Sequence, residues 1–403
     1  MSVKLGQSDF DRGLELLKRI GGSDFDGPVA KLAEVSKDMA ELTVAFPYGQ
    51  ILSRGLLDLR TRQICTVSCL AAHGSAQNQL RFHMHGLLNA GGTPQDLVEL
   101  MYLSTALIGF PTAINAIDIL REIFKARSIS YRDTPTESST SNPDRYVNGL
   151  LAFERLMHLP AEEYVGALTK LSPEIAKWTM EFEFGDVFAR LGLSPRDKHF
   201  IAICMLATVG NRQVQLGTHL KAALACGTTV NEISEVFIQL SAYAGFPTAL
   251  NAFSVLSATM NEPHVPHDKS THPPSSNDEG SSRMEKGFAS LAATSGGSGE
   301  AVVRSFDDIA PDIGRMIVEH SYGDIFCRDG IDPKTRELTA CAALAAKGTR
   351  TTETPLRVHV KAALKVGASK TELIETMLNL LPYCGYPAVQ AALLIVTEEI
   401  SDG

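Results

Sequence analysis

Three histidines, each in a helix-forming segment that follows basic residues, are the side chains of this sequence best suited to acid–base chemistry. They are His83, His219 and His359. Histidine exchanges protons near neutral pH, and arginine binds carboxylates through paired hydrogen bonds. The accompanying basic residues are Arg54 and Arg62, Arg190 and Lys198, and Arg328 and Arg336. We therefore expect the basic residues to bind a substrate carboxylate and the histidines to transfer a proton.

These residues belong to a unit that occurs three times. The run aromatic-Gly-x-apolar-x-x-Arg contains Gly49, Gly185 and Gly323, so it returns after 136 and then 138 residues. The basic residues, the histidine and a closing Gly-aromatic-Pro recur with it. Copy three carries two extra residues between Gly348 and His359. Repetition at a fixed period predicts tandem domains, which we place at residues 9–127 (copy one), 145–260 (copy two) and 283–401 (copy three).

Each copy is predicted to be all-helical. Long apolar segments rich in Ala and Leu, such as residues 195–208, favour buried helices over strands. A hydroxyl residue followed three positions later by an acid predicts a helix start at residues 93–96, 229–232 and 369–372. The Gly-aromatic-Pro sequences should break or bend the helix, because proline lacks the amide hydrogen. Segments 128–144 and 261–282, rich in Ser, Thr, Pro and Asn, are predicted linkers.

Composition narrows the class of protein. The chain has 403 residues, a net charge of −9 and no apolar run long enough for a membrane helix. An acidic balance argues against a nucleic-acid partner, and we expect no membrane contact either. Seven scattered cysteines, an odd count, predict reduced thiols and a cytoplasmic location. No phosphate-binding glycine loop is present. The linker histidines 264, 267 and 272 lie in a Pro-rich segment unsuited to a fixed metal geometry, so we expect neither cofactor nor metal.

The motifs together resemble the carboxymuconolactone decarboxylase family, which has the alkylhydroperoxidase D-like fold. The blocks that carry the resemblance are found most fully in copy two, at residues 184–190, 192–197, 219–228, 232–236 and 243–252. The resemblance implies helical units that assemble through helical faces, often as hexamers. Two chains would supply six units, so we expect a homodimer that forms a pseudo-hexamer. It also implies a cofactor-independent decarboxylase of a small carboxylated lactone or a related keto or enol acid.

The acidic residues depart from the family pattern. The glutamate expected four residues before the histidine is replaced by Gln79, Gln215 and Pro355. The acid expected directly after the second basic residue is present only as Glu337, which we include among the catalytic candidates. One working pocket with two structural copies, or pockets between copies, both fit this distribution.

Three other functions remain open. A same-fold isomerase, cyclase or dehydratase of secondary metabolism would explain the missing glutamates. A thiol peroxidase of the alkylhydroperoxidase type is disfavoured, because no thiols stand seven and four residues before the histidines. A non-catalytic scaffold would make the histidines structural.

Overall fold

The computed structural model describes residues 7–131, 144–263, 265, 281–348 and 352–401. Within these ranges the secondary structure is helical and contains no strand, as the sequence predicted. No helix in the described part of the chain combines the length and apolarity needed to cross a membrane. Most of the two predicted linkers, together with histidines 264, 267 and 272, lies outside the described residues.

The chain divides into two compact bodies. The N-terminal body comprises Ser2–Gly245 and Ser254–Lys269, and the C-terminal body comprises Phe246–Phe253 and Ser270–Gly403. Copies one and two therefore share a body, apart from Phe246–Phe253, and copy three lies in the other.

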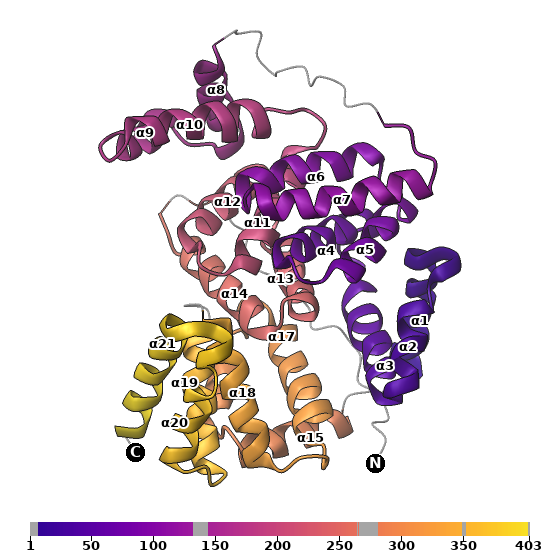
Figure 1. The fold of residues 1–403 in the computed structure, drawn as a ribbon, viewed down its shortest axis with the longest axis vertical. Helices are drawn as coiled ribbons and strands as arrows, with labels where there is room; N and C mark the ends of the chain where they lie inside the picture. The colour runs from indigo at the N-terminus through magenta and orange to yellow at the C-terminus, as the bar shows by residue number, and fades with distance from the viewer. Residues whose placement is uncertain (1–6, 132–143, 264, 266–280, 349–351, 402–403) are drawn as a thin grey trace. The chain divides into compact units, whose positions relative to one another are not determined.

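Copy one begins with three α-helices, a short 3-10 helix and a π-helix, and it continues with four α-helices (Figure 1). Its elements are α1 (Gln7–Gly21), η1 (Gly22–Asp24), α2 (Gly27–Val35), α3 (Lys37–Thr43), η2 (Val44–Leu52), α4 (Leu59–His73), α5 (Gln77–Asn89), α6 (Pro94–Leu107) and α7 (Phe110–Ala126).

Copy two repeats this order. Its elements are α8 (Arg145–Met157), α9 (Ala161–Thr169), α10 (Pro173–Trp178), η3 (Thr179–Phe188), α11 (Pro195–Val209), α12 (Gln213–Ala225), α13 (Val230–Tyr243) and α14 (Phe246–Met260).

Copy three repeats it again, and its last element, α21, contains a bend at Gly385. Its elements are α15 (Ser281–Ala293), α16 (Gly297–Arg304), α17 (Pro311–Met316), η5 (Ile317–Phe326), α18 (Pro333–Lys347), α19 (Glu353–Lys365), α20 (Lys370–Leu378) and α21 (Leu381–Ser401).

The predicted helix boundaries are confirmed by their capping geometry. Thr93, Thr229 and Ser369 each accept a hydrogen bond from the amide three residues on, whose acidic side chain bonds back to the cap. The glycine of each Gly-aromatic-Pro has a positive φ, between 76° and 92°, which ends one helix before proline begins the next. These breaks orient the two closing helices of every copy.

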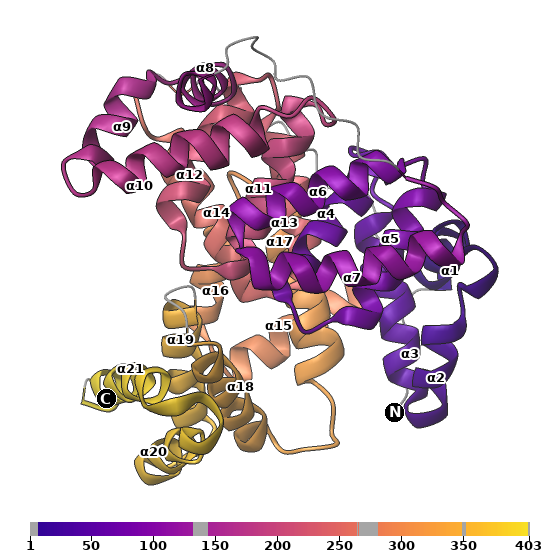
Figure 2. The same cartoon turned by 45° about the horizontal axis from the view of Figure 1, so that its top comes forward.

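Copies one and two pack through equivalent elements in the N-terminal body. Helix α4 lies against α11, α6 lies against α11, and α13 lies against α4 (Figures 1 and 2). The π-helices join the arrangement, since α6 contacts η3 and α13 contacts η2. Each contact made by one copy thus has a counterpart made by the other, which is the pattern of a two-fold dimer within one chain.

The C-terminal body has its own core. Leu344, Leu356, Val360, Met377 and Val396 are among the buried side chains that α18, α19, α20 and α21 bring together. A second cluster joins η5 to α15 and to the start of α14, through Val318, Leu291 and Phe246 among others. Copy three therefore keeps the helix packing of the repeat.

Candidate active site

Each predicted histidine hydrogen-bonds the residue that directly follows the second basic residue of its own copy. His83 Nδ1 lies 2.9 Å from Gln63 Oε1, and His359 Nδ1 lies 2.7 Å from Glu337 Oε2. In copy two the partner is another histidine, since the Nδ1 atoms of His219 and His199 are 3.2 Å apart. The fourth and fifth helices of the repeat supply the two side chains. The three copies thus share one framework with three different chemical partners.

In copy one the histidine is enclosed by aromatic rings. Tyr48 stacks on His83 with ring centroids 6.2 Å apart, and Phe82 and Tyr243 meet it edge-on at 5.3 Å each. Burial lowers the pKa of His83 to about 3. Tyr243 comes from α13 of copy two, so the neighbouring copy completes the enclosure. This imidazole is neutral and tightly packed.

In copy two the hydrogen bonds fix the tautomers of the histidine pair. His199 Nε2 lies 3.1 Å from the Leu156 carbonyl oxygen, which can only accept, so this nitrogen carries the hydrogen. Burial lowers the pKa of His199 to about 4 and that of His219 to about 3, so both rings are neutral at pH 7. His199 Nδ1 then accepts from His219 Nδ1–H. The remaining nitrogen of His219, Nε2, therefore holds a lone pair.

A cavity of about 440 Å³ lies beside His219. Its polar lining includes Tyr164, Glu183, Arg212 and Gln215, and its apolar lining includes phenylalanine and leucine side chains of copy two. Copy one also contributes, through Ala106 and Leu107 at the end of α6. The cavity is large enough for a small organic acid. It lies between copies, one of the two arrangements that the sequence left open.

Among the side chains that line this cavity, Glu183 can gain or lose a proton near neutral pH. It belongs to the π-helix η3, between two phenylalanines, and burial raises its pKa to about 7. An apolar environment disfavours the ionised carboxylate, so the acid keeps its proton in much of the population at neutral pH. Tyr164 lines the same wall. Its pKa is raised to about 12, mainly by burial and to a lesser extent by the charge of Glu183. A neutral carboxylic acid thus faces the same space as a guanidinium group.

Most of the predicted basic residues of copies one and two hold glutamates of the other copy. Arg54 and Arg62 both donate to Glu235, at 2.5 to 2.9 Å. Arg190 donates to Glu99 at 3.0 to 3.2 Å. Glu99 and Glu235 occupy the same position in α6 and α13, so the ion pairs are reciprocal. These arginines fasten the two copies together, and their contact with a substrate stays a prediction.

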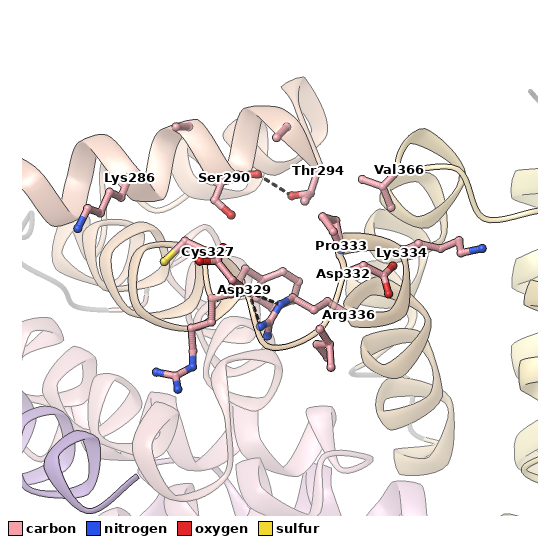
Figure 3. Close-up of a pocket in the computed structure, with 15 residues that line it drawn as sticks. Lys286, Ser290, Thr294, Cys327, Asp329, Asp332, Pro333, Lys334, Arg336 and Val366 are labelled. Atoms are coloured by element: carbon pink, nitrogen blue, oxygen red, sulfur yellow. Dashed lines mark hydrogen bonds between the residues drawn. The ribbon is translucent and has the colours of Figure 1, made fainter. Parts of the chain in front are cut away.

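Two of the three remaining predicted basic residues, Lys198 and Arg336, donate to backbone carbonyl oxygens. Lys198 Nζ donates to the Phe188 carbonyl at 2.7 Å and also to the Arg190 carbonyl. Arg336 donates to the Arg328 carbonyl at 3.2 and 2.5 Å. Figure 3 shows the Arg336 side chain reaching back toward the segment of Cys327 and Asp329, at a cavity of about 710 Å³ that Arg328 also lines. None of these three residues lies in the lining of the cavity beside His219.

Copy three contains the one carboxylate–histidine pair among the three histidine sites. Glu337 is fully buried, and its Oε1 atom has no hydrogen-bond partner within the described residues. The His359 side chain is 18% exposed and lies 5.9 Å from Phe326, ring to ring. A carboxylate on Nδ1 orients an imidazole and leaves Nε2 to face the substrate. This pair has the geometry of a general base.

Sequence reasoning did not select Glu183, Arg212 or Tyr164. A usable signal was present in the differences between copies. Arg212 is matched by Ala76 and Thr352, and Glu183 is matched by Pro47 and Ser321. A charge that occurs in only one of three aligned copies is not needed for the fold. An acid buried among phenylalanines also costs free energy unless it is paired or protonated, so its presence suggests a role in the chemistry. A search of the three aligned copies for charged residues that occur in one copy alone would have found this site.

The cysteines do not form a peroxidase arrangement in the described residues. Cys65, Cys69 and Cys204 are buried free thiols. Burial raises the pKa of Cys204 well above its ordinary value, with neighbouring Cys65 and Cys69 adding to the shift. Thiol reduction of peroxide needs a thiolate at neutral pH, which burial opposes.

Comparison with known proteins identifies the repeated unit. Residues 37–122, 173–258 and 311–398, together more than half of the chain, match the model of the carboxymuconolactone decarboxylase family. The chain is 32% identical over 100 residues to 4-carboxymuconolactone decarboxylase from Acinetobacter baylyi, covering 25% of this chain and 72% of that protein. It is 26% identical over 87 residues to nitrosuccinic acid decarboxylase from Metarhizium robertsii, covering 22% of this chain and 59% of that protein.

A solved structure shows a weaker likeness. It is described as a gamma-carboxymuconolactone decarboxylase subunit from Burkholderia xenovorans, and it matches with a TM-score of 0.39 at 24% identity, over 63% of this chain and 98% of that one. The family model, matched three times in order, gives the assignment. The chain belongs to the carboxymuconolactone decarboxylase family and carries three copies of its domain in tandem.

Proposed function

We propose that the chain is a cofactor-independent decarboxylase of a small organic acid, and that the cavity of copy two is its working site. The observation that carries the proposal is the joint lining by Arg212, Glu183 and His219 of one cavity of about 440 Å³. The same three positions hold Ala76, Pro47 and His83 in copy one, and Thr352, Ser321 and His359 in copy three. Copy two is the copy in which a cation, an acid and the histidine coincide.

Arg212 is suited to bind a carboxylate of the substrate. It lies at the start of α12 and donates a hydrogen bond to the Leu107 carbonyl of copy one, which orients the guanidinium group. A guanidinium group offers five donors, so others remain for a carboxylate. Two relatives are named for acids that contain carboxyl groups, 4-carboxymuconolactone and nitrosuccinic acid. The substrate class we propose is a carboxylic acid of this size with an adjoining electron-accepting group.

Decarboxylation of such an acid leaves an electron pair that moves into the lactone carbonyl or the nitro group. The apolar walls of the cavity favour the neutral carbon dioxide over the carboxylate it came from. A proton must then reach carbon. Glu183, with its pKa raised to about 7, holds a proton at neutral pH and can deliver it as a general acid. The carboxylate that remains regains a proton from solvent.

His219 has a different part in this proposal from the one the sequence suggested. Its Nδ1–H is engaged by His199, and its Nε2 holds a lone pair. A neutral imidazole with a pKa of about 3 is a poor proton donor at pH 7 but a good hydrogen-bond acceptor. We propose that His219 accepts a hydrogen bond at Nε2, either from a protonated group of the substrate or from the Glu183 acid, and so holds that group in position.

A second candidate activity rests on copy three. The 2.7 Å contact between Glu337 Oε2 and His359 Nδ1 suits abstraction of a proton from carbon, as isomerases and dehydratases require. Substrate conversion without release of carbon dioxide, lost in His359→Asn and retained in His219→Asn, would favour this activity.

The direct test is to incubate the full chain with 4-carboxymuconolactone and, separately, with nitrosuccinic acid, and to measure released carbon dioxide. We expect release from at least one acid, and loss of release in Arg212→Met. The matched control is Arg121→Met, which removes an exposed arginine of α7 outside the cavity. Absence of carbon dioxide from both acids, with the protein folded by circular dichroism, would reject these substrates.

A further inference from the structure

A thiol and an imidazole meet at the surface of copy two. The sulfur of Cys226 lies 3.4 Å from Nε2 of His158, within the range of a hydrogen bond to sulfur, and the two residues are 68 positions apart in the chain. Cys226 directly follows α12 and His158 directly follows α8, two helices that pack against each other. His158 is exposed and Cys226 is partly buried, so small solutes can reach the sulfur. The pair consists of a nucleophile and an adjacent base.

His158 adopts a backbone conformation that glycine normally takes. Its φ is 53°, and its counterparts in copies one and three are Gly22 and Gly296, with φ of 62° and 57°. Glycine enters this left-handed region without steric cost, whereas a residue with a Cβ atom is less stable there. Copy two therefore carries histidine at a position that the backbone reserves for glycine in the other copies, and the requirements of the fold do not explain the exchange.

In the other two copies, unreactive groups link the same pair of helices. The Asn89 amide of α5 donates to the Ile20 carbonyl of α1 at 2.7 Å, and Lys365 Nζ of α19 donates to the Ala292 carbonyl of α15 at 2.5 Å. The residue at this position in copy two is Ala225, whose side chain forms no hydrogen bond. The contact of thiol and imidazole replaces the link. Packing requires a polar contact here, but it does not require a thiol.

The surroundings of the pair favour transfer of a proton from sulfur to nitrogen during a reaction. Burial raises the pKa of Cys226, so its thiol is protonated at neutral pH. Both residues lie at helix C-termini, where carbonyl oxygens stabilise a cation and destabilise an anion. A free thiolate is therefore disfavoured, whereas an imidazole that accepts a proton is stabilised. The sulfur can react by passing its proton to His158 as a new bond forms.

We propose that Cys226 is a modification site for small-molecule disulfides, with His158 as its general base. The sulfur of Cys226 attacks one sulfur of the disulfide while its proton moves to Nε2 of His158. A new S–S bond joins Cys226 to one half of the molecule, and the original S–S bond breaks. The other half leaves as a thiolate and takes the proton from His158. Cys226 is oxidised and the leaving half is reduced, so no further reactant is needed. The inference is independent of the proposed decarboxylation.

The experiment incubates the full chain with hydroxyethyl disulfide and follows the mixed disulfide at each cysteine by mass spectrometry of peptides. We expect Cys226 to react faster than Cys384, which is also partly buried but whose sulfur meets no histidine within the described residues. His158→Gly introduces the residue of the other copies, so it should preserve the fold and slow the reaction of Cys226 by about 10²-fold. His158→Asn also tolerates the positive φ and should slow the reaction similarly.

The design separates loss of the base from loss of access. Removal of the imidazole uncovers the sulfur, so a slower reaction in His158→Gly could not come from poorer access. Cys226→Ala introduces the residue that copy one has at this position, Ala90, and should abolish the label on that peptide alone. Cys384→Ala is the matched control and should leave the rate at Cys226 unchanged. Circular dichroism verifies that each variant is folded.

Two results would overturn the proposal. One is a natural chain in which Cys226 reacts no faster than Cys384. The other is a rate at Cys226 that stays the same in both His158 variants, which would mean that the imidazole takes no part in the reaction.

Discussion

The histidine sites of copies one and two are built on the same helices and differ in what the other copy places over them. Copy two covers His83 with the ring of Tyr243, whereas copy one offers Leu107 at the equivalent position beside His219. Copy one also lacks the arginine and the acid, since Ala76 and Pro47 replace them. The comparison shows that one scaffold can yield a packed core and a chemically equipped cavity, depending on a few side chains.

The largest effect is expected from removing the acid of copy two. Glu183→Gln keeps the shape and cannot deliver a proton, so kcat for carbon dioxide release should fall by about 10²–10⁴-fold. The exchange of Pro47 for alanine, at the matching position of copy one, is the control and should leave kcat unchanged. Equal losses in the two variants would contradict the assignment of activity to copy two.

The pH dependence follows from the same acid. The pKa of Glu183 is raised to about 7, so the active, protonated form prevails below that pH and is lost above it. We expect kcat to fall as pH rises through about 7 and to show no decline from His219 until pH approaches about 3. The decline near 7 should be absent from the residual activity of Glu183→Gln. A decline that persists there belongs to another group.

The ion pairs between the copies should differ in their contribution to stability. Glu235 binds two arginines, so Glu235→Ala leaves the buried Arg62 and the partly buried Arg54 without their carboxylate and should cost about 3–5 kcal/mol. Glu99→Ala should cost less, because Arg190 keeps its contact with the Tyr102 ring at 3.8 Å. Urea denaturation of the two variants measures the difference. Equal costs would show that the two ion pairs are equivalent in spite of their geometry.

Acid should weaken the Glu235 cluster. Burial raises the pKa of Glu235, but the hydrogen bonds and charges of Arg54 and Arg62 outweigh it, and the net pKa is lowered. The stability that this carboxylate contributes is therefore present above its unfolded pKa and is lost as pH falls through the folded one. The difference in unfolding free energy between the natural chain and Glu235→Ala should shrink below about pH 4.

A smaller effect is expected from making the copy-two cavity resemble copy one. Leu107→Tyr places a ring beside His219 at the position that Tyr243 takes beside His83, and it should raise KM about tenfold, or 1.4 kcal/mol of binding. The chain should keep its thermal stability, since the ring enters existing space. An unchanged KM would show that the substrate binds away from α6.

Much of the fold was available from the sequence. The three capping pairs and the three Gly-aromatic-Pro breaks fix helix ends through local backbone chemistry, and the structure confirms them. The period of the repeat gave the three copies because equivalent residues must return at equal spacing. The sequence selected Glu337 alone at the position after the second basic residue. The structure shows that Gln63, His199 and Glu337, which share this position, each contact the histidine of their own copy.

The tertiary structure decided which charged groups meet. Arg54 and Glu235 are 181 residues apart, and no local pattern relates them. The basic residues that recur in every copy were expected to bind substrate, yet in copies one and two the arginines hold the copies together, because buried guanidinium groups need carboxylates. Residues peculiar to one copy, Arg212 and Glu183, line the cavity instead. The basic residues that recur in every copy are those that packing requires. The charged residues found in one copy alone lie at the cavity, which only the folded chain reveals.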